Sequence, residues 1–268
     1  MKIHPGAIVS PDAELADDVE VGAYAIIEGG AKIGAGTVIE PMARVRGGAR
    51  IGCGCKICSF ATIAGEPQDL HFDASTQSFV EIGDGCVVRE GATIHRATLP
   101  GSSTKIGRNA LLMANSHIGH DCSVGDNFIM GCFSAAAGFV SIDDFVFVSG
   151  GVMVHQKTRI GEGVIISGCS AVSLDVPPFV NAFGRNDMSG INAIGMKRRS
   201  IPSESISDVR SLYAAVYADD SVRKNALSAI GANLAKTPEG RRFLEFFTAA
   251  DRHYLHPRHS SRTAGTAY

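Results

Sequence analysis

The chain has 268 residues, and its 25 Lys and Arg nearly balance its 27 Asp and Glu, giving a formal net charge of −2. This balance excludes a global attraction to nucleic acid or to an anionic membrane surface, and no apolar run reaches the roughly 18 residues of a membrane span. The 31 glycines and the absence of tryptophan suit repeated tight turns. The first residues lack the apolar core of a signal peptide, so we expect a cytoplasmic protein.

A six-residue period runs through the first two thirds of the chain. Aliphatic side chains recur every six positions from Ile3 to Ile63, and again from Ile106 to Val172 apart from Ala136. This period fits neither a helix nor a long alternating strand, but it fits very short strands joined by turns. It is similar to the hexapeptide repeat of the left-handed parallel β-helix, which has three strands and 18 residues per coil. We therefore predict a mainly β solenoid over residues 1–176, with coils about 4.8 Å apart.

Two stretches interrupt the period, and the end of the chain departs from it. We expect loops near 64–80 and 98–104, where polar and turn-forming residues replace the repeat, and loops on a rigid scaffold often carry binding groups. Pro177-Pro178 should stop the coil. We then predict a linker at 177–200, a small helical domain at 201–256 with Ser203 as a helix cap and further helices after Asp220 and from Thr237-Pro238, and a disordered tail at 257–268.

Two histidines and a carboxylate lie close together in the repeat, at His117, His120 and Asp121. Ile118 belongs to the inward column, so both histidines should point outward or along a corner. An imidazole titrates near neutral pH, and a neighbouring carboxylate can fix its tautomer, which makes His120 a candidate general base. Residues 18 apart should stack, so the backbone N–H of Gly138 would lie beside His120, where it can stabilise an oxyanion. These features indicate acyl transfer.

An outward-facing site on a narrow prism has few walls, and β-helices of this kind commonly form trimers with clefts between subunits, so we expect a homotrimer. We expect no metal site: the seven cysteines should be reduced thiols, and Cys53, Cys55 and Cys58 lack the second matching pair of a zinc site.

Several motifs together resemble those of one family, the acyl-carrier-protein-dependent UDP-N-acetylglucosamine O-acyltransferases of lipid A biosynthesis. They are GEPQDL at 65–70, TIHR at 93–96, LLMANSHIGHDC at 111–122, GCS at 168–170, DVPP at 175–178 and KRR at 197–199. The resemblance covers almost the whole chain. It implies transfer of a 3-hydroxyacyl chain from acyl carrier protein to the 3-hydroxyl of UDP-N-acetylglucosamine, the first step of that pathway, with no cofactor.

The resemblance also implies roles for individual residues. His120 would be the general base, Asp121 would orient it, Gly138 would supply the oxyanion donor, and Gly168 would occupy the position that limits acyl-chain length. The basic run that ends in Arg199 would meet the carrier protein or the diphosphate. The substrate-binding positions are Gln68, Asp69, His71, His117, Phe139, His155, Gln156, Asn192, Arg198 and Arg199.

The chain departs from the family pattern at four positions, one of which is Ala97, where a glycine is expected after His95-Arg96. Phe139 replaces a histidine near the sugar, His71 replaces a lysine, and Ile194 stands where a glutamate near the nucleotide base is expected. Because of these changes, acylation of another nucleotide sugar, including N-acylation of a 3-amino sugar, stays open, as does the acyl length. A third hypothesis is a zinc hydratase of the γ-carbonic anhydrase type, which needs three converging imidazoles. Counting by 18 places His95 on a different face from His117, and His155 two coils away, so this hypothesis is the weakest of the three.

Overall fold

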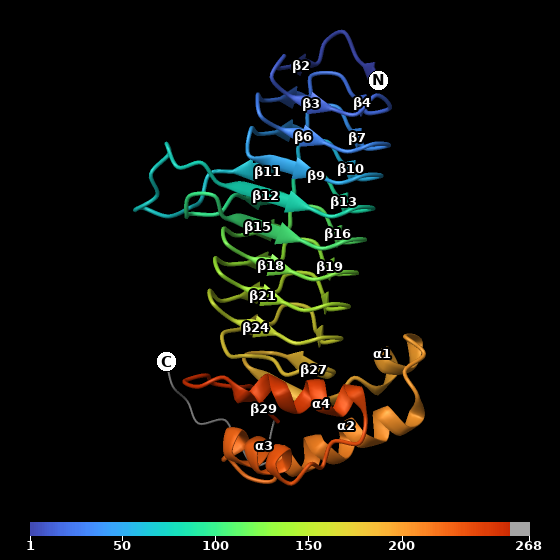
Figure 1. Cartoon of the computed structure of the whole chain (residues 1–268), viewed down its shortest axis with the longest axis vertical. Coiled ribbons are helices and arrows are strands. Elements are labelled where there is room, and N and C mark those ends of the chain that lie inside the picture. Colours follow the sequence, from blue (N-terminus) through green and yellow to red (C-terminus); the bar gives the residue numbers. More distant parts are fainter. Residues whose placement is uncertain (258–268) are drawn as a thin grey trace.

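A three-sided solenoid makes up most of the molecule, and helices cover its C-terminal end (Figure 1). This computed structural model describes residues 1–257. Within them, short strands stack into three sheets, called A, B and C here, of 12, 9 and 8 strands. Each coil contributes one strand to each sheet in turn, so strands three elements apart in the chain lie side by side. The predicted fold class, a left-handed parallel β-helix followed by a small helical domain, is confirmed.

The strands are mostly two residues long. Sheet A contains β1 (Lys2–Ile3), β4 (Glu20–Val21), β7 (Val38–Ile39), β10 (Lys56–Ile57), β13 (Val87–Val88), β16 (Leu111–Leu112), β19 (Ile129–Met130), β22 (Phe147–Val148), β25 (Ile165–Ile166), β27 (Val180–Phe183), β28 (Asp187–Ile191) and β29 (His256–Pro257). Sheet B contains β2 (Ile8–Val9), β5 (Ile26–Ile27), β8 (Arg44–Val45), β11 (Thr62–Gly65), β14 (Thr93–His95), β17 (His117–Ile118), β20 (Ala135–Ala136), β23 (Met153–Val154) and β26 (Ala171–Val172). Sheet C contains β3 (Glu14–Leu15), β6 (Lys32–Ile33), β9 (Ala49–Ile51), β12 (Phe79–Ile82), β15 (Ser103–Ile106), β18 (Ser123–Val124), β21 (Ser141–Ile142) and β24 (Arg159–Ile160).

The six-residue column forms the core of the solenoid. In most two-residue strands the second side chain points inward, and Ile27, Ile63 and Ile118 are at most 1% exposed. The first side chain points outward because successive side chains of a strand face opposite sides of its sheet. The repeat therefore specifies the core, while the outward positions are free to vary from coil to coil.

Two coils are longer than 18 residues, and they carry the predicted loops. Lys56 of β10 pairs with Val87 of β13, 31 positions on, because the segment between β11 and β12 leaves the coil and projects outward (Figure 1). Thr93 of β14 pairs with His117 of β17, 24 positions on, because one extra hexapeptide lies between β14 and β15. Each loop enters or leaves the coil at sheet B, so both lie beside its outward face.

The helical part begins earlier than predicted. The segment 177–200, expected to be a linker, contains β27 and β28, which extend sheet A, and then α1 (Ala193–Arg198). The remaining helices are α2 (Ser203–Val216), α3 (Val222–Gly231), α4 (Pro238–Glu245) and a 3₁₀ turn, η1 (Phe246–Thr248). Ser203 is the first residue of α2 rather than its cap, since Pro202 holds the cap position.

The predicted start of α4 is confirmed: the Thr237 side chain caps the helix by accepting a hydrogen bond from the Gly240 N–H, and Pro238 follows in the first turn. Of the predicted tail at 257–268, only Pro257 is among the described residues, where it belongs to β29. No helix in residues 1–257 is both long enough and apolar enough to cross a membrane.

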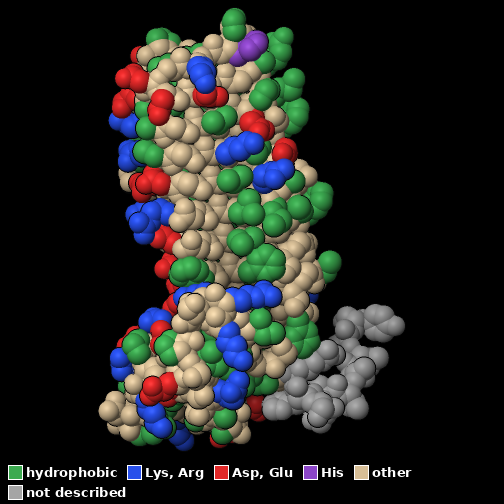
Figure 2. Space-filling view, turned by 90° about the vertical axis from the view of Figure 1, so that its right-hand side faces the viewer, with side chains coloured by type: hydrophobic (Ala, Val, Ile, Leu, Met, Phe, Trp, Pro, Cys, Tyr) green, Lys and Arg blue, Asp and Glu red, His purple; other side chains and the backbone are tan. Residues whose placement is uncertain are grey.

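On the face drawn in Figure 2, apolar side chains are most numerous along one side of the solenoid, with some charged side chains between them, and charged side chains also line the other edge. Four large apolar residues lie at the corner between sheets A and B, where each is about half or more exposed: Tyr24, Met42, Phe60 and Phe133. All four have φ between 59° and 64°, a left-handed conformation that bulky residues rarely adopt. We call this row the apolar edge. Charged side chains gather instead on the outward side of sheet C.

Candidate active site

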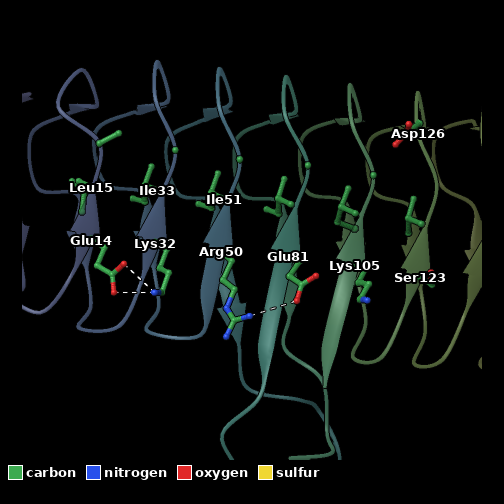
Figure 3. Close-up of a pocket in the computed structure, with 18 of the residues that line it drawn as sticks. Glu14, Leu15, Lys32, Ile33, Arg50, Ile51, Glu81, Lys105, Ser123 and Asp126 are labelled. Carbon is green, nitrogen blue, oxygen red and sulfur yellow. Dashed lines mark hydrogen bonds and ion pairs between the residues drawn. The ribbon is translucent and has the colours of Figure 1, made fainter. Parts of the chain in front are cut away.

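Two hollows of the described surface lie on different sheets of the solenoid. The hollow on sheet C, of about 1140 Å³, runs along a row of glycines and charged side chains (Figure 3). Its charges pair with one another across neighbouring strands, as Lys32 does with Glu14 at 2.9 Å and Arg50 with Glu81 at 3.8 Å. No histidine, and no cysteine, lines it. The hollow on sheet B, of about 530 Å³, is lined by four histidines, which makes it the candidate site for acid–base chemistry.

His120 and Asp121 form a hydrogen-bonded pair at the corner between β17 and β18. His120 Nδ1 lies 2.8 Å from Asp121 Oδ2, and their side chains are only 15% and 9% exposed. The carboxylate can only accept, so Nδ1 is the donor of this bond, and in the neutral imidazole the lone pair is then on Nε2. This is the tautomer that a general base needs.

The loop at 98–104 holds the carboxylate of this pair. Thr98 donates to Asp121 twice: its N–H lies 3.1 Å from the carboxylate oxygens, and its hydroxyl lies 2.8 Å from Oδ2. The Asp121 N–H in turn lies 2.8 Å from the Thr104 hydroxyl oxygen, which fixes the turn at φ +58°. Sequence reasoning placed a loop here but missed Thr98. The feature of the sequence that could have pointed to Thr98 was the extra hexapeptide between β14 and β15.

Gly138 lies directly under the imidazole, as the 18-residue spacing predicted. A Cβ atom built on Gly138 would lie 2.5 Å from His120 Cε1 and 2.6 Å from Nε2, so any side chain would displace the ring. Within residues 1–257 the Gly138 N–H donates to no other group, and it remains available to a ligand. Phe139 follows at φ +62° and meets His120 edge to face, with ring centroids 5.2 Å apart. Phe139 thus limits the ring's movement but offers no hydrogen bond.

His95 and His117 form a second pair above the first. Their rings are 4.7 Å apart and nearly perpendicular, so the prediction that they lie on different faces is wrong. The 18-residue count failed because this coil has 24 residues. Burial lowers the pKa of His95 to about 4, and the neighbouring His117 and His120 add to the effect. The pKa of His117 is also lowered, chiefly by burial, while its Nδ1 lies 2.7 Å from the Thr93 hydroxyl. Both rings are therefore neutral at pH 7.

Below the histidines the hollow continues along sheet B as a groove. One row of its floor is the outward column of His117, Ala135, Met153 and Ala171, which pair in register from strand to strand. His155 and Gln156 line the side nearest the His120 corner, and Gln68 lines the upper end. The structure thus brings together six of the predicted residues besides His120: Gln68, His117, Gly138, His155 and Gln156 in the lining, and Asp121 behind it.

Comparison with known proteins supports this interpretation over the length of the chain. Residues 103–134 match the family described as bacterial transferase hexapeptide, and residues 175–255 match "Udp N-acetylglucosamine O-acyltransferase; Domain 2". The solved UDP-N-acetylglucosamine acyltransferase from Campylobacter jejuni is 33% identical, with 96% of this chain and 100% of that chain covered and a TM-score of 0.89. The one from Bacteroides fragilis is 34% identical, covering 94% and 99%, with a TM-score of 0.89. The one from Francisella novicida is 31% identical, covering 95% and 94%, with a TM-score of 0.90.

The chain belongs to the UDP-N-acetylglucosamine O-acyltransferase family. The resemblance predicted from the motifs is confirmed, and with it the acyltransferase class. The predicted roles of single residues stay predictions.

Several positions that the resemblance implies lie away from the groove of this acyltransferase. Asp69 and His71 are exposed on the 66–78 loop, where the His71 N–H donates to Asp69 Oδ1 at 2.9 Å. Gly168 is exposed beside the corner between sheets A and B, on the opposite flank of sheet B from His120. A Cβ on Gly168 would lie 3.3 Å from the Gly150 carbonyl oxygen, a tight contact that needs a small local shift, and 3.9 Å from Ser149 Cβ.

The positions on α1 are engaged in structure within this chain. Asn192 is 4% exposed and caps α1, with Oδ1 accepting from the Gly195 N–H and Nδ2 donating to the Gly163 carbonyl, both at 2.9 Å. Arg199 forms an ion pair with Glu162 and lies 4.0 Å from the centre of the Phe145 ring. Arg198 and Ile194 are exposed, Ile194 at 67%.

One set of potential metal ligands lies outside the lining of the groove: atoms of Glu40, Cys58 and Glu90 are within 4.8 Å of one another. Their carboxylates already have cationic partners, since Lys56 is 2.8 Å from Glu40 and Arg89 is 3.0 Å from Glu90. In the described part of the chain, the histidines of sheet B do not form such a group of three. The prediction of no metal at the active site stays a prediction.

Proposed function

We propose that this acyltransferase transfers a 3-hydroxyacyl group from acyl carrier protein to the 3-hydroxyl of UDP-N-acetylglucosamine, with His120 as the general base. The observation that carries the proposal is the hydrogen-bonded His120–Asp121 pair, whose free Nε2 faces Gly138 at the head of the groove. Solved relatives named for acylation of this nucleotide sugar match the chain over more than nine tenths of its length. We propose that this reaction takes place in the cytoplasm.

In the first step, the oxygen of the sugar 3-hydroxyl attacks the thioester carbonyl carbon. His120 Nε2 accepts the proton of this hydroxyl at the same time. The imidazolium that forms is stabilised by the Asp121 carboxylate, which also accepts hydrogen bonds from the Thr98 N–H and hydroxyl. Negative charge builds up on the carbonyl oxygen, and the Gly138 N–H is the donor available there. In the second step, the tetrahedral intermediate collapses, the C–S bond breaks, and the imidazolium returns its proton to the departing thiolate.

We infer that the active enzyme is a homotrimer in which a second copy covers the apolar edge. Four large apolar side chains in strained conformations lie in a row there, and burying them against another subunit would offset both exposure and strain. Gly168 lies on the same flank and is exposed in the single chain. The assembly would let Gly168, Asn192, Arg198 and Arg199 act on a groove that they do not line in one subunit.

Incubating the purified protein with UDP-N-acetylglucosamine and a series of hydroxyacyl carrier proteins, followed by mass spectrometry of the nucleotide sugar, tests the proposal. We expect one acyl addition that is labile to mild alkali, as an ester is. If no chain length yields product with the wild-type protein, the proposal is wrong.

A second acceptor is favoured by one observation: the ring edge of Phe139 provides no polar contact at the acceptor end of the site. A 3-amino sugar depends less on polar groups that activate the nucleophile, because an amine is a better nucleophile than a hydroxyl. The same incubation with the UDP-linked 3-amino analogue would give an alkali-stable amide. A higher kcat/KM for the amino sugar than for UDP-N-acetylglucosamine would make N-acylation the main activity.

A further inference from the structure

A single arginine ends the groove at the opposite end from the histidines. Arg185 pairs with Ala171 as an isolated parallel bridge: the Ala171 N–H donates to the Gly184 carbonyl at 2.8 Å, and the Asn186 N–H donates to the Ala171 carbonyl at 3.2 Å. Arg185 therefore adds one more rung to the outward column of sheet B. Its side chain is exposed, and it lines the same hollow as His120.

The electrostatic setting of Arg185 favours an anionic ligand. No aspartate or glutamate lines the hollow, and no carboxylate among residues 1–257 lies within ion-pair distance of the guanidinium. The other exposed cations of the solenoid are commonly paired, as Lys32 and Arg50 are on sheet C. A guanidinium with five free donors at the end of an otherwise apolar floor is well suited to bind a phosphate group.

The distance along the column selects between two sources of phosphate. His117 and Arg185 are four strand spacings apart, roughly 19 Å at about 4.8 Å each. Ala135, Met153 and Ala171 fill the positions between them. The diphosphate of a nucleotide sugar is only a few bonds from the sugar hydroxyl that reacts. The phosphodiester of a pantetheine-type carrier arm is separated from its thioester by about fifteen bonds, which span on the order of 19 Å when extended.

We propose that Arg185 binds a phosphate group of the substrates, and that this phosphate is the phosphodiester of the acyl donor's carrier arm. The arm then lies along the column with its thioester at His120 and its phosphate at Arg185. The inference rests on the proposed function for the identity of the donor. It adds a donor-positioning residue that the motifs of the chain did not indicate. Arg185 acts through binding and not on the reacting atoms.

Donors with and without the phosphate test the role of Arg185. Steady-state rates are measured with acyl-phosphopantetheine and with acyl-pantetheine, which lacks the phosphate, for the wild type, Arg185→Gln and Arg185→Lys. Lys105→Gln is the matched control, since Lys105 is an exposed cation of β15 on sheet C. In the wild type we expect the phosphate to lower the donor KM about tenfold or more. Arg185→Gln should abolish that difference without changing kcat, Arg185→Lys should restore part of it, and Lys105→Gln should leave it unchanged.

Each other outcome has a defined meaning. Equal loss on both donors would show a packing role, and a raised KM for the nucleotide sugar alone would assign Arg185 to the diphosphate. A changed preference for acyl length with the phosphate effect intact would show that the column holds the acyl chain. Each of these three results overturns the inference, and so does the absence of any effect of Arg185→Gln. If the wild type turns over neither of these carrier-free donors, calorimetric titration with the same two donors decides whether Arg185 binds the phosphate, while the incubation with hydroxyacyl carrier proteins decides the proposed function separately.

Discussion

The outward rows of sheets B and C differ although one repeat builds both sheets. The row on sheet C reads Glu14, Lys32, Arg50, Glu81, Lys105 and Ser123, whereas the row on sheet B reads Thr93, His117, Ala135, Met153, Ala171 and Arg185 (Figure 3 shows the former). On sheet C each charged side chain has a neighbour of opposite sign on an adjacent strand, so the charges of this row partly neutralise one another within the sheet. In the part of sheet B that lines the groove, the apolar side chains of Ala135, Met153 and Ala171 separate His117 from Arg185, and no carboxylate lines this floor. The hexapeptide repeat thus specifies the scaffold, and the outward residues specify the chemistry.

Among substitutions on the two faces, His120→Ala should have the largest effect on activity. We expect His120→Ala to lower kcat about 10³-fold or more, because general-base catalysis is lost, while the unfolding free energy changes by less than about 1 kcal/mol at this corner position. Rates by product mass spectrometry and stability by urea titration measure the two effects. Lys105→Ala on sheet C, the control, should change neither. A comparable fall in stability for His120→Ala would show that the histidine is structural.

Gly138→Ala should have the next largest effect. The new methyl group would lie 2.5 Å from His120 Cε1, so the ring must move, and displacement of a catalytic group by about 1 Å can cost on the order of 10²-fold in rate. Gly6→Ala is the control, since its Cβ would approach nothing closer than 3.4 Å. Full activity of Gly138→Ala would mean that the imidazole does not work from the position it occupies in the structure.

Thr98→Val should lower kcat about tenfold and leave both KM values unchanged. The change removes the hydroxyl donor 2.8 Å from Asp121 Oδ2 but keeps the backbone N–H, so the carboxylate holds His120 less firmly. Thr98→Ser retains the hydroxyl and should recover most of the rate. If serine fails to rescue, or if KM changes in place of kcat, Thr98 acts on substrate binding or loop packing and does not position the base through Asp121.

The sequence predicted the part of this site that follows the repeat. The inward column, the outward direction of His117 and the stacking of Gly138 under His120 all depend on an 18-residue coil, and they are confirmed where the coil has that length. Counting failed at His95, because the loop at 98–104 lengthens its coil to 24 residues. Thr98 and Arg185 were not predicted, since a loop contact and a bridge formed after the repeat ends leave no periodic signal.

The buried histidines of sheet B should make stability depend on pH. The pKa of His95 is about 4 in the folded protein and about 6.5 in the unfolded chain, so between these values the unfolded chain binds more protons. The unfolding free energy contributed by His95 is therefore complete above about pH 6.5 and decreases as pH falls toward 4. Melting temperatures from pH 7.5 to 4.5 should fall less steeply for His95→Gln than for the wild type. His4→Gln, at an exposed position, should keep the wild-type slope. Identical slopes for all three proteins would place the titrating group elsewhere.

The smallest effect should come from the charged row of sheet C. The Lys32–Glu14 pair is more than half exposed on both sides, and such pairs contribute about 0–1 kcal/mol, partly because water and salt screen them. Lys32→Gln should therefore leave kcat/KM unchanged and lower the unfolding free energy by less than about 0.5 kcal/mol. In 1 M NaCl that small difference should disappear, and in Glu14→Gln the same substitution should have no effect at any salt concentration. A loss of activity in Lys32→Gln would contradict the view that only sheet B carries the active site. It would mean that sheet C also binds a substrate or partner.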